Sequence, residues 1–196
     1  MARRRSNNFT RTARRLTLAL VILAIGSAAL VYVRWLYREA RYDKLIEEIA
    51  PKYGVDKFLV KAVIRQESGF DPFALSSTGA IGLMQVMEGA GRDWARATRR
   101  ENFSRDTLWN ERTNIEAGTW YLGQALRYWQ RQGVDDPVPF ALAEYNAGRG
   151  NVQKWLPPTK PWTAREFVAG IKNSGVRYYV GKVSSYYEHY KARGKL

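Results

Sequence analysis

The feature that most limits what this chain can fold into is an apolar run near the N-terminus. Residues 16–33, LTLALVILAIGSAALVYV, hold no charged side chain. At 1.5 Å per residue, a helix of this length spans roughly 27 Å, close to the ~30 Å hydrocarbon core of a bilayer. The run therefore predicts a transmembrane anchor over residues 16–35, with Trp35 and Tyr37 at the water interface.

Charge around the run predicts its orientation. The chain has 32 Lys and Arg against 18 Asp and Glu, a net charge of +14, and the first fifteen residues contain six Arg and no acid. Positive flanks of a transmembrane helix stay on the cytoplasmic side. Residues 1–15 are therefore predicted to be a basic cytoplasmic tail, and residues 36–196 a domain on the opposite side of the membrane.

Two other interpretations of the N-terminus stay open. The Arg cluster could be a nucleic-acid-binding arm, but the adjoining apolar run favours a topology signal, so no nucleic-acid partner is predicted. Residues 26–29 could end a cleavable signal peptide. Apolar character continues to Val33, which favours an uncleaved anchor, and both interpretations export the rest of the chain.

Composition restricts the chemistry. There is no Cys and one His, His189. Disulfides, thiol nucleophiles, Cys-type zinc sites and multi-His metal sites are therefore excluded. We predict no metal and no cofactor, and any acid–base chemistry must use carboxylates, Tyr or Lys.

The exported part has the pattern of a mainly α single domain. Asp56 is a suitable N-cap and Gly69 a suitable C-cap for a helix between them. Asp136-Pro137 and the capping box at Thr163 predict two further helix starts. The expected helices cover residues 42–50, 57–68, 114–130 and 137–147, a segment from about 164, and residues 176–191.

Glu67 is out of place in this pattern. It follows Val63 by four residues and Ile64 by three, so it projects from the apolar face of its helix. Partial burial and the negative end of the helix dipole both raise the pKa of a carboxyl group. Glu67 thus has the character of a general acid, unless it is simply a helix-end Glu that turns back into solvent.

Three ordered segments resemble the signatures of one family. They are ESGF at residues 67–70, GAIGLMQ at 79–85 and AEYNAG at 143–148, and YGVD at 53–56 and NIEAG at 114–118 also match. Over about residues 45–187 the chain resembles the soluble lytic transglycosylase (SLT) domain family. The resemblance implies a lysozyme-like fold that cleaves the MurNAc–GlcNAc bond of peptidoglycan glycan strands and leaves a 1,6-anhydro-muramoyl end. It places the anchor in the bacterial inner membrane and the domain in the periplasm.

The resemblance also implies roles for single residues. Glu67 matches the one catalytic Glu, which acts first as an acid and then as a base. Ser76 matches a loop Ser that contacts the muramoyl unit, and Gln85 ends a segment that lines the cleft. Tyr145 matches the Tyr whose hydroxyl faces the catalytic carboxylate, and Asn146 beside it supports the site.

One carboxylate suffices for this reaction. Ordinary glycosidases need two, about 5–5.5 Å apart for retention or about 6.5–9.5 Å apart for inversion. Here the C6 hydroxyl of the substrate attacks, and a well-oriented intramolecular nucleophile has an effective molarity on the order of 10⁵ M or more.

Glu144 and residues 175–180 bear on the assignment of a one-carboxylate reaction. Glu144 projects about 100° away from Tyr145 on a helix, which favours a surface or structural role. If it reached the cleft, it could position a water and make the protein a hydrolase. Residues 175–180, GVRYYV, replace the family's usual Glu-Thr-Arg-x-Tyr-Val run. The missing Glu leaves open how the last helix is tied to the cleft.

Four aromatic or imidazole side chains can be assigned a location from the sequence. Trp129 is expected in the core, Trp155 and Trp162 are the candidates for exposed sugar stacking, and His189 is expected on the surface.

The alternatives to a membrane-anchored lytic transglycosylase are a muramidase that hydrolyses the same bond and an inactive wall-binding or secretion-apparatus scaffold. A cell-wall or secretion complex stays open as a partner.

Overall fold

The computed structural model describes the backbone of residues 2–196, and the side chains of residues 14–33 and 36–196. The side chains of Trp35 and of the Arg cluster before Arg14 lie outside the described residues. The chain forms two units, residues 1–40 and 41–196. The first consists of α1 (Ala2–Arg41), whose apolar side chains from Leu16 to Val33 are exposed. By length and composition alone, this helix could cross a membrane.

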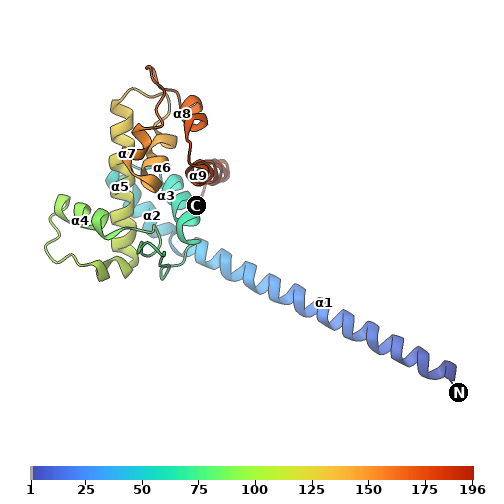
Figure 1. Ribbon diagram of the computed structural model, residues 1–196. Helices are drawn as coiled ribbons and strands as arrows, with labels where there is room; N and C mark the ends of the chain where they lie inside the picture. Colours follow the sequence, from blue (N-terminus) through green and yellow to red (C-terminus); the bar gives the residue numbers. More distant parts are fainter. Residues whose placement is uncertain (1) are drawn as a thin grey trace. The chain divides into compact units, whose positions relative to one another are not determined.

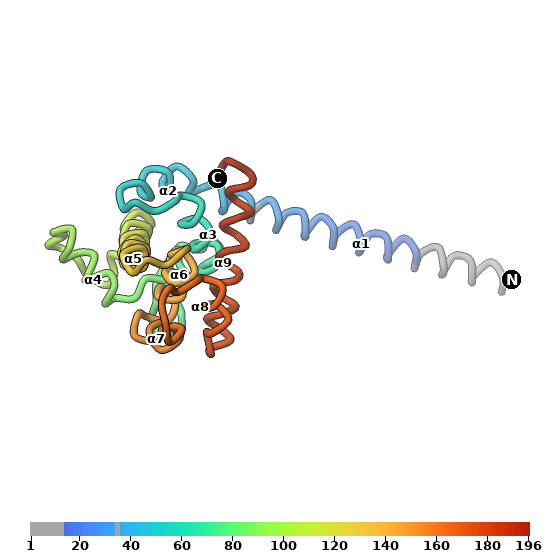
Figure 2. The backbone as a smooth tube through the Cα atoms, turned by 90° about the horizontal axis from the view of Figure 1, so that it is seen from above, coloured from blue at the N-terminus to red at the C-terminus, as the bar shows by residue number. Residues whose placement is uncertain are grey.

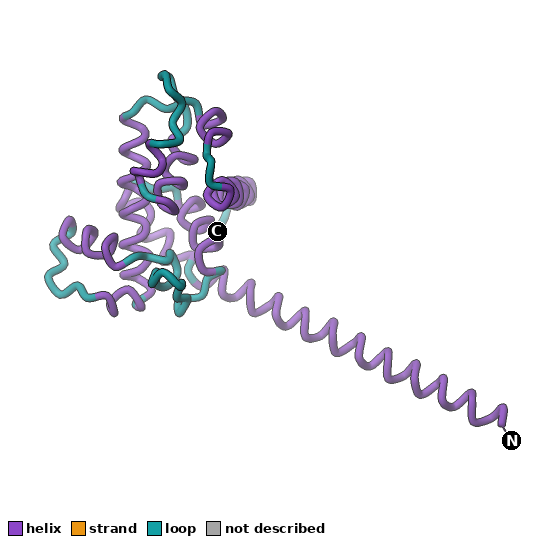
Figure 3. Tube along the Cα trace, in the orientation of Figure 1, coloured by secondary structure: helices purple, strands orange, loops and turns teal. Residues whose placement is uncertain are grey.

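The second unit is built from helices and loops, without a strand in the part of the chain described (Figure 3). It begins with α2 (Asp43–Ile49), the 3-10 turn η1 (Ala50–Tyr53) and α3 (Lys57–Ser68). After a loop come α4 (Glu88–Ala97), η2 (Arg105–Trp109) and the longest helix of this unit, α5 (Glu111–Arg131). The C-terminal part holds α6 (Pro137–Ala147), α7 (Arg149–Gln153), α8 (Ala164–Gly170) and α9 (Ser174–Arg193).

Helix ends lie where capping chemistry puts them. The Asp56 carboxylate accepts the backbone N–H of Phe58 at the start of α3, and Gly69 ends that helix with φ +57°. Asp136 caps α6 through the N–H of Val138, and Thr163 caps α8. The predicted helix over residues 57–68 is thus confirmed, and the other predicted helices are confirmed within a few residues at each end.

Helix α5 runs the length of the domain and organises its core (Figure 1). Helix α6 lies against α5, and α9 crosses at a steep angle to pack on α3 and α6; Figure 2 shows α5 end-on and α9 along its length. The rings of Phe140 and Phe167 stack at 4.1 Å, and Trp129 stacks on Phe140 at 5.2 Å. These aromatic contacts join α5, α6 and α8.

The sequence pattern missed two helices. In α4, the buried residues are Gly91, Trp94 and Ala95, and with Trp94 as the one large side chain they give no run of large apolar residues at helical spacing. Helix α7 has five residues and buries only Val152. Both flank the segments that form the candidate site.

Candidate active site

Glu67 lies in the last turn of α3, two residues before the C-cap Gly69. Val63 and Ile64, one turn before it, are fully buried. Burial raises the pKa of Glu67 to about 7 from an ordinary value of 4.5, and a hydrogen bond from Tyr179 partly opposes that rise. The carboxyl group can therefore hold or release a proton near neutral pH, as a general acid and base requires.

The hydrogen-bond partner of Glu67 comes from the last helix. The hydroxyl of Tyr179, a buried residue on α9, donates to Oε1 of Glu67 at 2.6 Å. Burial, and next the charge of Glu67, raise the pKa of Tyr179 well above its ordinary value, so this hydroxyl keeps its proton. The contact ties α9 to the end of α3. The sequence did not predict a role for Tyr179, because its partner lies 112 residues earlier in the chain.

Tyr145 approaches the carboxyl group but bonds elsewhere. Its hydroxyl donates to the backbone oxygen of Met84 at 2.7 Å. Burial is the main cause of its raised pKa, and the charge of Glu67 is the next. The structure thus places Tyr145 within electrostatic range of Glu67, while the direct bond comes from Tyr179.

The loop between α3 and α4 is held by its own side chains. Ser68 Oγ donates to the oxygen of Leu83 at 2.8 Å, and Gln85 Nε2 donates to the oxygens of Ala74 and Gly82 at 3.1 and 3.0 Å. Ser76 Oγ accepts the N–H of Ala80 at 2.9 Å and pairs with the Thr78 hydroxyl. Gln85 and Ser76 therefore shape the loop through contacts that the sequence did not predict.

Two non-glycine residues in this loop adopt the left-handed conformation, Phe70 with φ +66° and Gln85 with φ +47°. Such conformations cost on the order of 1–2 kcal/mol in L residues, so the surrounding contacts must impose them. They sit at the two ends of the loop that follows Glu67.

Asn114 on α5 fixes the middle of the loop. Its buried side-chain amide accepts the N–H of Met84 at 2.8 Å and donates to the oxygens of Ile81 and Leu108 at 2.7 and 2.9 Å. A Cβ on Gly82 (φ +73°) would lie 2.5 Å from Nδ2 of Asn114. The close approach explains both the Gly and the Asn, which the sequence offered only as matches to the family pattern.

A groove of about 310 Å³ runs between this loop and α5–α6. Gln85, Tyr145 and Asn146 line it together with Gly118 and Tyr121. Asn146 is exposed at its edge. Three of the predicted site residues thus line one groove. Ser76 and Glu67 are not among the residues that line it. The charge of Glu67 nevertheless acts on Tyr145, which does line it.

Glu144 has a structural environment. It is 3 % exposed, accepts the indole N–H of Trp129 at 2.8 Å, and is bound by two nitrogens of Arg149 at 2.7–3.1 Å. Both carboxylate oxygens are therefore occupied. The structural role predicted for Glu144 is confirmed, although the residue is buried and not on the surface.

The structure also shows how far the candidate aromatic residues and His189 are exposed. Trp129 is fully buried, as predicted. Trp155 and Trp162, the candidates for exposed sugar stacking, are half-buried against the core, and Trp162 donates its indole N–H to the oxygen of Pro157 at 3.1 Å. Packing on the core covers part of each ring. His189 is exposed on α9, as predicted.

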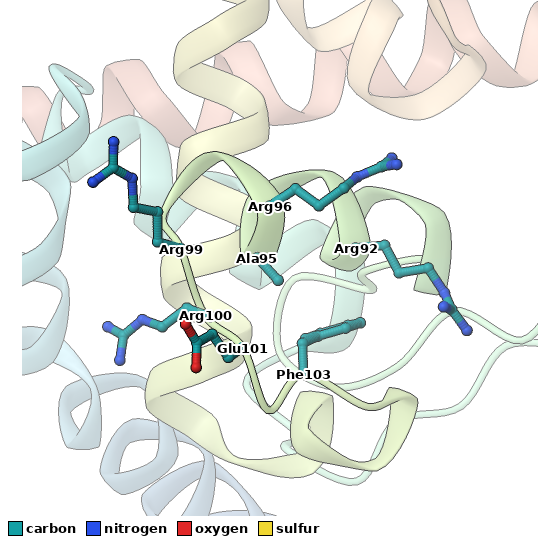
Figure 4. A pocket seen from close by; sticks show the side chains of 7 residues that line it. All are labelled: Arg92, Ala95, Arg96, Arg99, Arg100, Glu101 and Phe103. Atoms are coloured by element: carbon teal, nitrogen blue, oxygen red, sulfur yellow. The ribbon is translucent and has the colours of Figure 1, made fainter.

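A second hollow, of about 380 Å³, lies beside the C-terminal end of α4. Four arginines, Arg92, Arg96, Arg99 and Arg100, line it (Figure 4). None of the predicted site residues lines this second hollow. Among the described residues, no group of three or more His, Asp or Glu could hold a metal ion.

Comparison with known proteins shows the family of the chain. The family model of the transglycosylase SLT domain matches residues 44–167. Two curated proteins named membrane-bound lytic murein transglycosylase C, from Glaesserella parasuis and Klebsiella pneumoniae, are 39% and 37% identical over 120 residues, which are 59% of this chain and 33% of each relative. The chain thus spans about a third of the length of these relatives.

Solved structures give the same family. An inactive mutant of the lytic transglycosylase Slt from Pseudomonas aeruginosa matches with a TM-score of 0.69 and 30% identity, over 79% of this chain and 24% of that one. The 70 kDa soluble lytic transglycosylase of Escherichia coli matches with a TM-score of 0.67 and 29% identity, over 77% and 24%. The predicted mainly α, lysozyme-like fold is confirmed. Because the family model matches more than half of its residues, the chain belongs to the transglycosylase SLT domain family.

Proposed function

We propose that this protein is a peptidoglycan lytic transglycosylase that cleaves the MurNAc–GlcNAc bond and leaves a 1,6-anhydro-muramoyl end. The observation that carries the proposal is the state of Glu67: burial raises the pKa of its carboxyl group to about 7, and Tyr179 holds it at 2.6 Å. A carboxyl group in this state is an acid at neutral pH and becomes a base after one proton transfer. Relatives named lytic murein transglycosylases support the same activity.

In the proposed reaction, Glu67 donates its proton to the glycosidic oxygen as the bond to MurNAc breaks. Glu67, now a carboxylate, then accepts the proton of the C6 hydroxyl as that oxygen attacks C1. The hydroxyl of Tyr179 donates to Oε1 throughout and stabilises the transient charge. No water is consumed, and the enzyme returns to its protonated form.

The surroundings of Glu144 favour this route over hydrolysis. A muramidase would need a second carboxylate to hold a water or to act as a nucleophile. Both oxygens of Glu144 are bound by Arg149 and Trp129, and the Asp71 carboxylate accepts the N–H of Phe73 in a turn. The groove residues Gln85, Tyr145 and Asn146 are proposed to bind the glycan strand, and Ser76 the muramoyl unit near the reacting bond.

We further propose that residues 16–35 anchor the protein in the bacterial inner membrane by a single pass, with residues 1–15 in the cytoplasm and residues 36–196 in the periplasm. The length and composition of α1 and the membrane-bound relatives support this arrangement.

The test is digestion of purified sacculi, followed by mass spectrometry of the released muropeptides. Anhydro ends weigh one water less than reducing ends, so the products separate the transglycosylase from the muramidase. Glu67→Gln is expected to abolish release, and Glu101→Gln, an exposed carboxylate on the loop after α4, serves as the matched control. Retained activity in Glu67→Gln would refute the assignment, and binding without product from the unaltered protein would favour the inactive scaffold.

A further inference from the structure

The positive charge of the second unit is concentrated at its C-terminal end. Residues 41–171 contain 18 Lys and Arg and 16 Asp and Glu, so they nearly balance. Residues 172–196 contain six basic residues and a single acid, Glu188. The six are Lys172, Arg177, Lys182, Lys191, Arg193 and Lys195. Helix α9 and its flanks therefore carry most of the net charge of this unit.

The outer face of α9 is shaped for a flat, anionic surface. Gly181, Ser185 and Ala192 are exposed and fall on one line at about 100° per residue. The exposed Glu188 lies beside this line and pairs with Lys191 at 3.5 Å, so it lowers the net positive charge of the face by one. On the same helical geometry, Lys182 and Arg193 flank this line on one side, and Arg177 and Lys191 flank it on the other. Small residues in the middle allow close approach, while long cationic side chains at both edges can reach toward a surface.

Tyr178 adds an interfacial contact to this face. Its side chain is 61% exposed, the only tyrosine of α9 exposed to this degree in the described structure. The Lys182 ammonium lies 5.6 Å from the centre of its ring. Exposed Tyr beside Lys or Arg is the combination that membrane–water interfaces favour, because each side chain has an apolar body and a polar end.

In the other arginine-rich surface, three of the four arginines form ion pairs. In the hollow beside α4 (Figure 4), Arg92 pairs with Glu88, Arg96 with Asp93, and Arg100 with Glu116. On α9, the described residues provide one ion pair, between Lys191 and Glu188 at 3.5 Å. The cations of α9 thus have the greater capacity to bind an external anion.

Chain length limits the distance between this domain and a membrane. The apolar run ends at Val33, and the domain begins at Arg41. Eight residues reach about 12 Å as a helix and at most about 29 Å fully extended. A domain of this length has a radius of gyration of about 15 Å and hence a diameter near 40 Å. A domain tethered so closely must stay beside the bilayer and present some face to it.

We propose that the outer face of α9 docks on anionic phospholipid headgroups of the membrane that holds the anchor. The proposal rests on the membrane anchoring proposed above. The opposite face of the same helix carries Tyr179, so docking fixes the orientation of the Tyr179–Glu67 pair relative to the bilayer. The domain then cleaves strands close to the membrane surface.

The test uses the full-length chain in vesicles of phosphatidylcholine with or without phosphatidylglycerol. The acetylation rates of Lys182, Lys191 and Lys195 are measured by mass spectrometry, with Lys154 as the internal reference. We expect these three lysines to be acetylated several-fold more slowly in the anionic vesicles, and Lys154 equally in both. Near 1 M salt, where the Debye length falls to about 3 Å, the protection should disappear.

Two triple variants sharpen the test. Lys182→Gln with Lys191→Gln and Arg193→Gln should weaken docking about fivefold per charge, about a hundredfold in all, and restore fast acetylation of Lys195. The matched control removes three exposed cations from other elements, Lys44, Arg99 and Arg131, and should keep Lys195 protected.

The outcomes separate the two proposals. Equal acetylation in both kinds of vesicle, with the protein resistant to carbonate extraction, would overturn docking and leave the anchor intact. Protection by added sacculi in neutral vesicles would overturn it in favour of the wall polymer as the ligand. Extraction of the protein by carbonate would refute the anchor and, with it, the tethering on which docking rests.

Discussion

Replacing Glu67 with Gln should make the protein more stable at alkaline pH while it abolishes the proposed activity. Burial raises the pKa of Glu67 to about 7, so above that pH the folded protein holds an ionised carboxylate in a poorly solvated place. Gln has nearly the same shape and still offers Tyr179 an oxygen acceptor. The variant therefore avoids the cost of ionisation at little cost in packing.

The size of the effect follows from the two pKa values. The group titrates at 4.5 when solvated and at about 7 in the fold, a difference worth about 3 kcal/mol at 1.36 kcal/mol per pKa unit. The folded state binds this proton more tightly than the unfolded state. Its contribution to the free energy of unfolding is thus complete below pH 4.5, falls as the pH rises, and is lost above pH 7.

Urea unfolding in detergent, followed by tryptophan fluorescence, measures this difference. All but one of the seven Trp lie in residues 41–196, so the signal reports that unit. Near pH 4.5, Glu67→Gln should match the wild type within about 1 kcal/mol, because the wild-type carboxyl is then largely neutral. Above pH 8 it should be more stable by about 3 kcal/mol.

Glu101→Gln, an exposed carboxylate substitution, controls for the loss of one negative charge and should stay within about 0.5 kcal/mol of the wild type. A Glu67→Gln advantage that is absent at pH 8, or equal at both pH values, would refute the claim that burial raises this pKa.

Three further substitutions test the framework of the site. Tyr179→Phe removes a hydrogen bond that stabilises the carboxylate, so turnover should fall about 10- to 100-fold and the alkaline limb of the pH–rate profile should move to higher pH. Gly82→Ala forces a Cβ against the Asn114 amide at positive φ and should cost about 3 kcal/mol in urea unfolding. Arg149→Gln leaves the buried Glu144 without its cation and should cost about 2–3 kcal/mol, since Arg149 is itself half-exposed.

Each of these three variants has a matched control. Tyr178→Phe, at the exposed neighbouring position, should leave the pH–rate profile in place, and an unshifted profile in Tyr179→Phe would contradict the positioning role. Gly89→Ala has no atom within 4 Å of the added Cβ and should be neutral or stabilising by up to about 1 kcal/mol. Arg131→Gln is the exposed control for Arg149, and equal stabilities of these two variants would argue against the buried ion pair.

The sequence predicted helix ends and helix faces where capping residues and apolar spacing determine them locally. Helix α3 could be placed because Asp56 and Gly69 cap its two ends and because Val63 and Ile64 define one apolar face. The same face made Glu67 stand out. Helix α4 could not be placed in this way, since Trp94 is the one large side chain among its buried residues.

The partners in the site follow from tertiary packing. No local pattern predicts that Tyr179 meets Glu67 across 112 residues, or that Asn114 binds the backbone of Met84 and Ile81 in a loop about 30 residues earlier. The family pattern predicted that Tyr145 faces the catalytic carboxylate, but its hydroxyl donates to the backbone oxygen of Met84.

Two tightly packed glycines, one lining the groove and one in the loop beside it, have a consequence for which positions of this protein can vary. A Cβ on Gly82 would meet Asn114 at 2.5 Å, and one on Gly118 would meet Met84 at 2.7 Å. A site without space for one extra methyl group does not accept even the smallest side chain, so Gly118 and Gly82 leave no room for substitution. New preferences for peptide stems or strand ends must arise at the exposed rim, where Met87 and Asn146 have room to change.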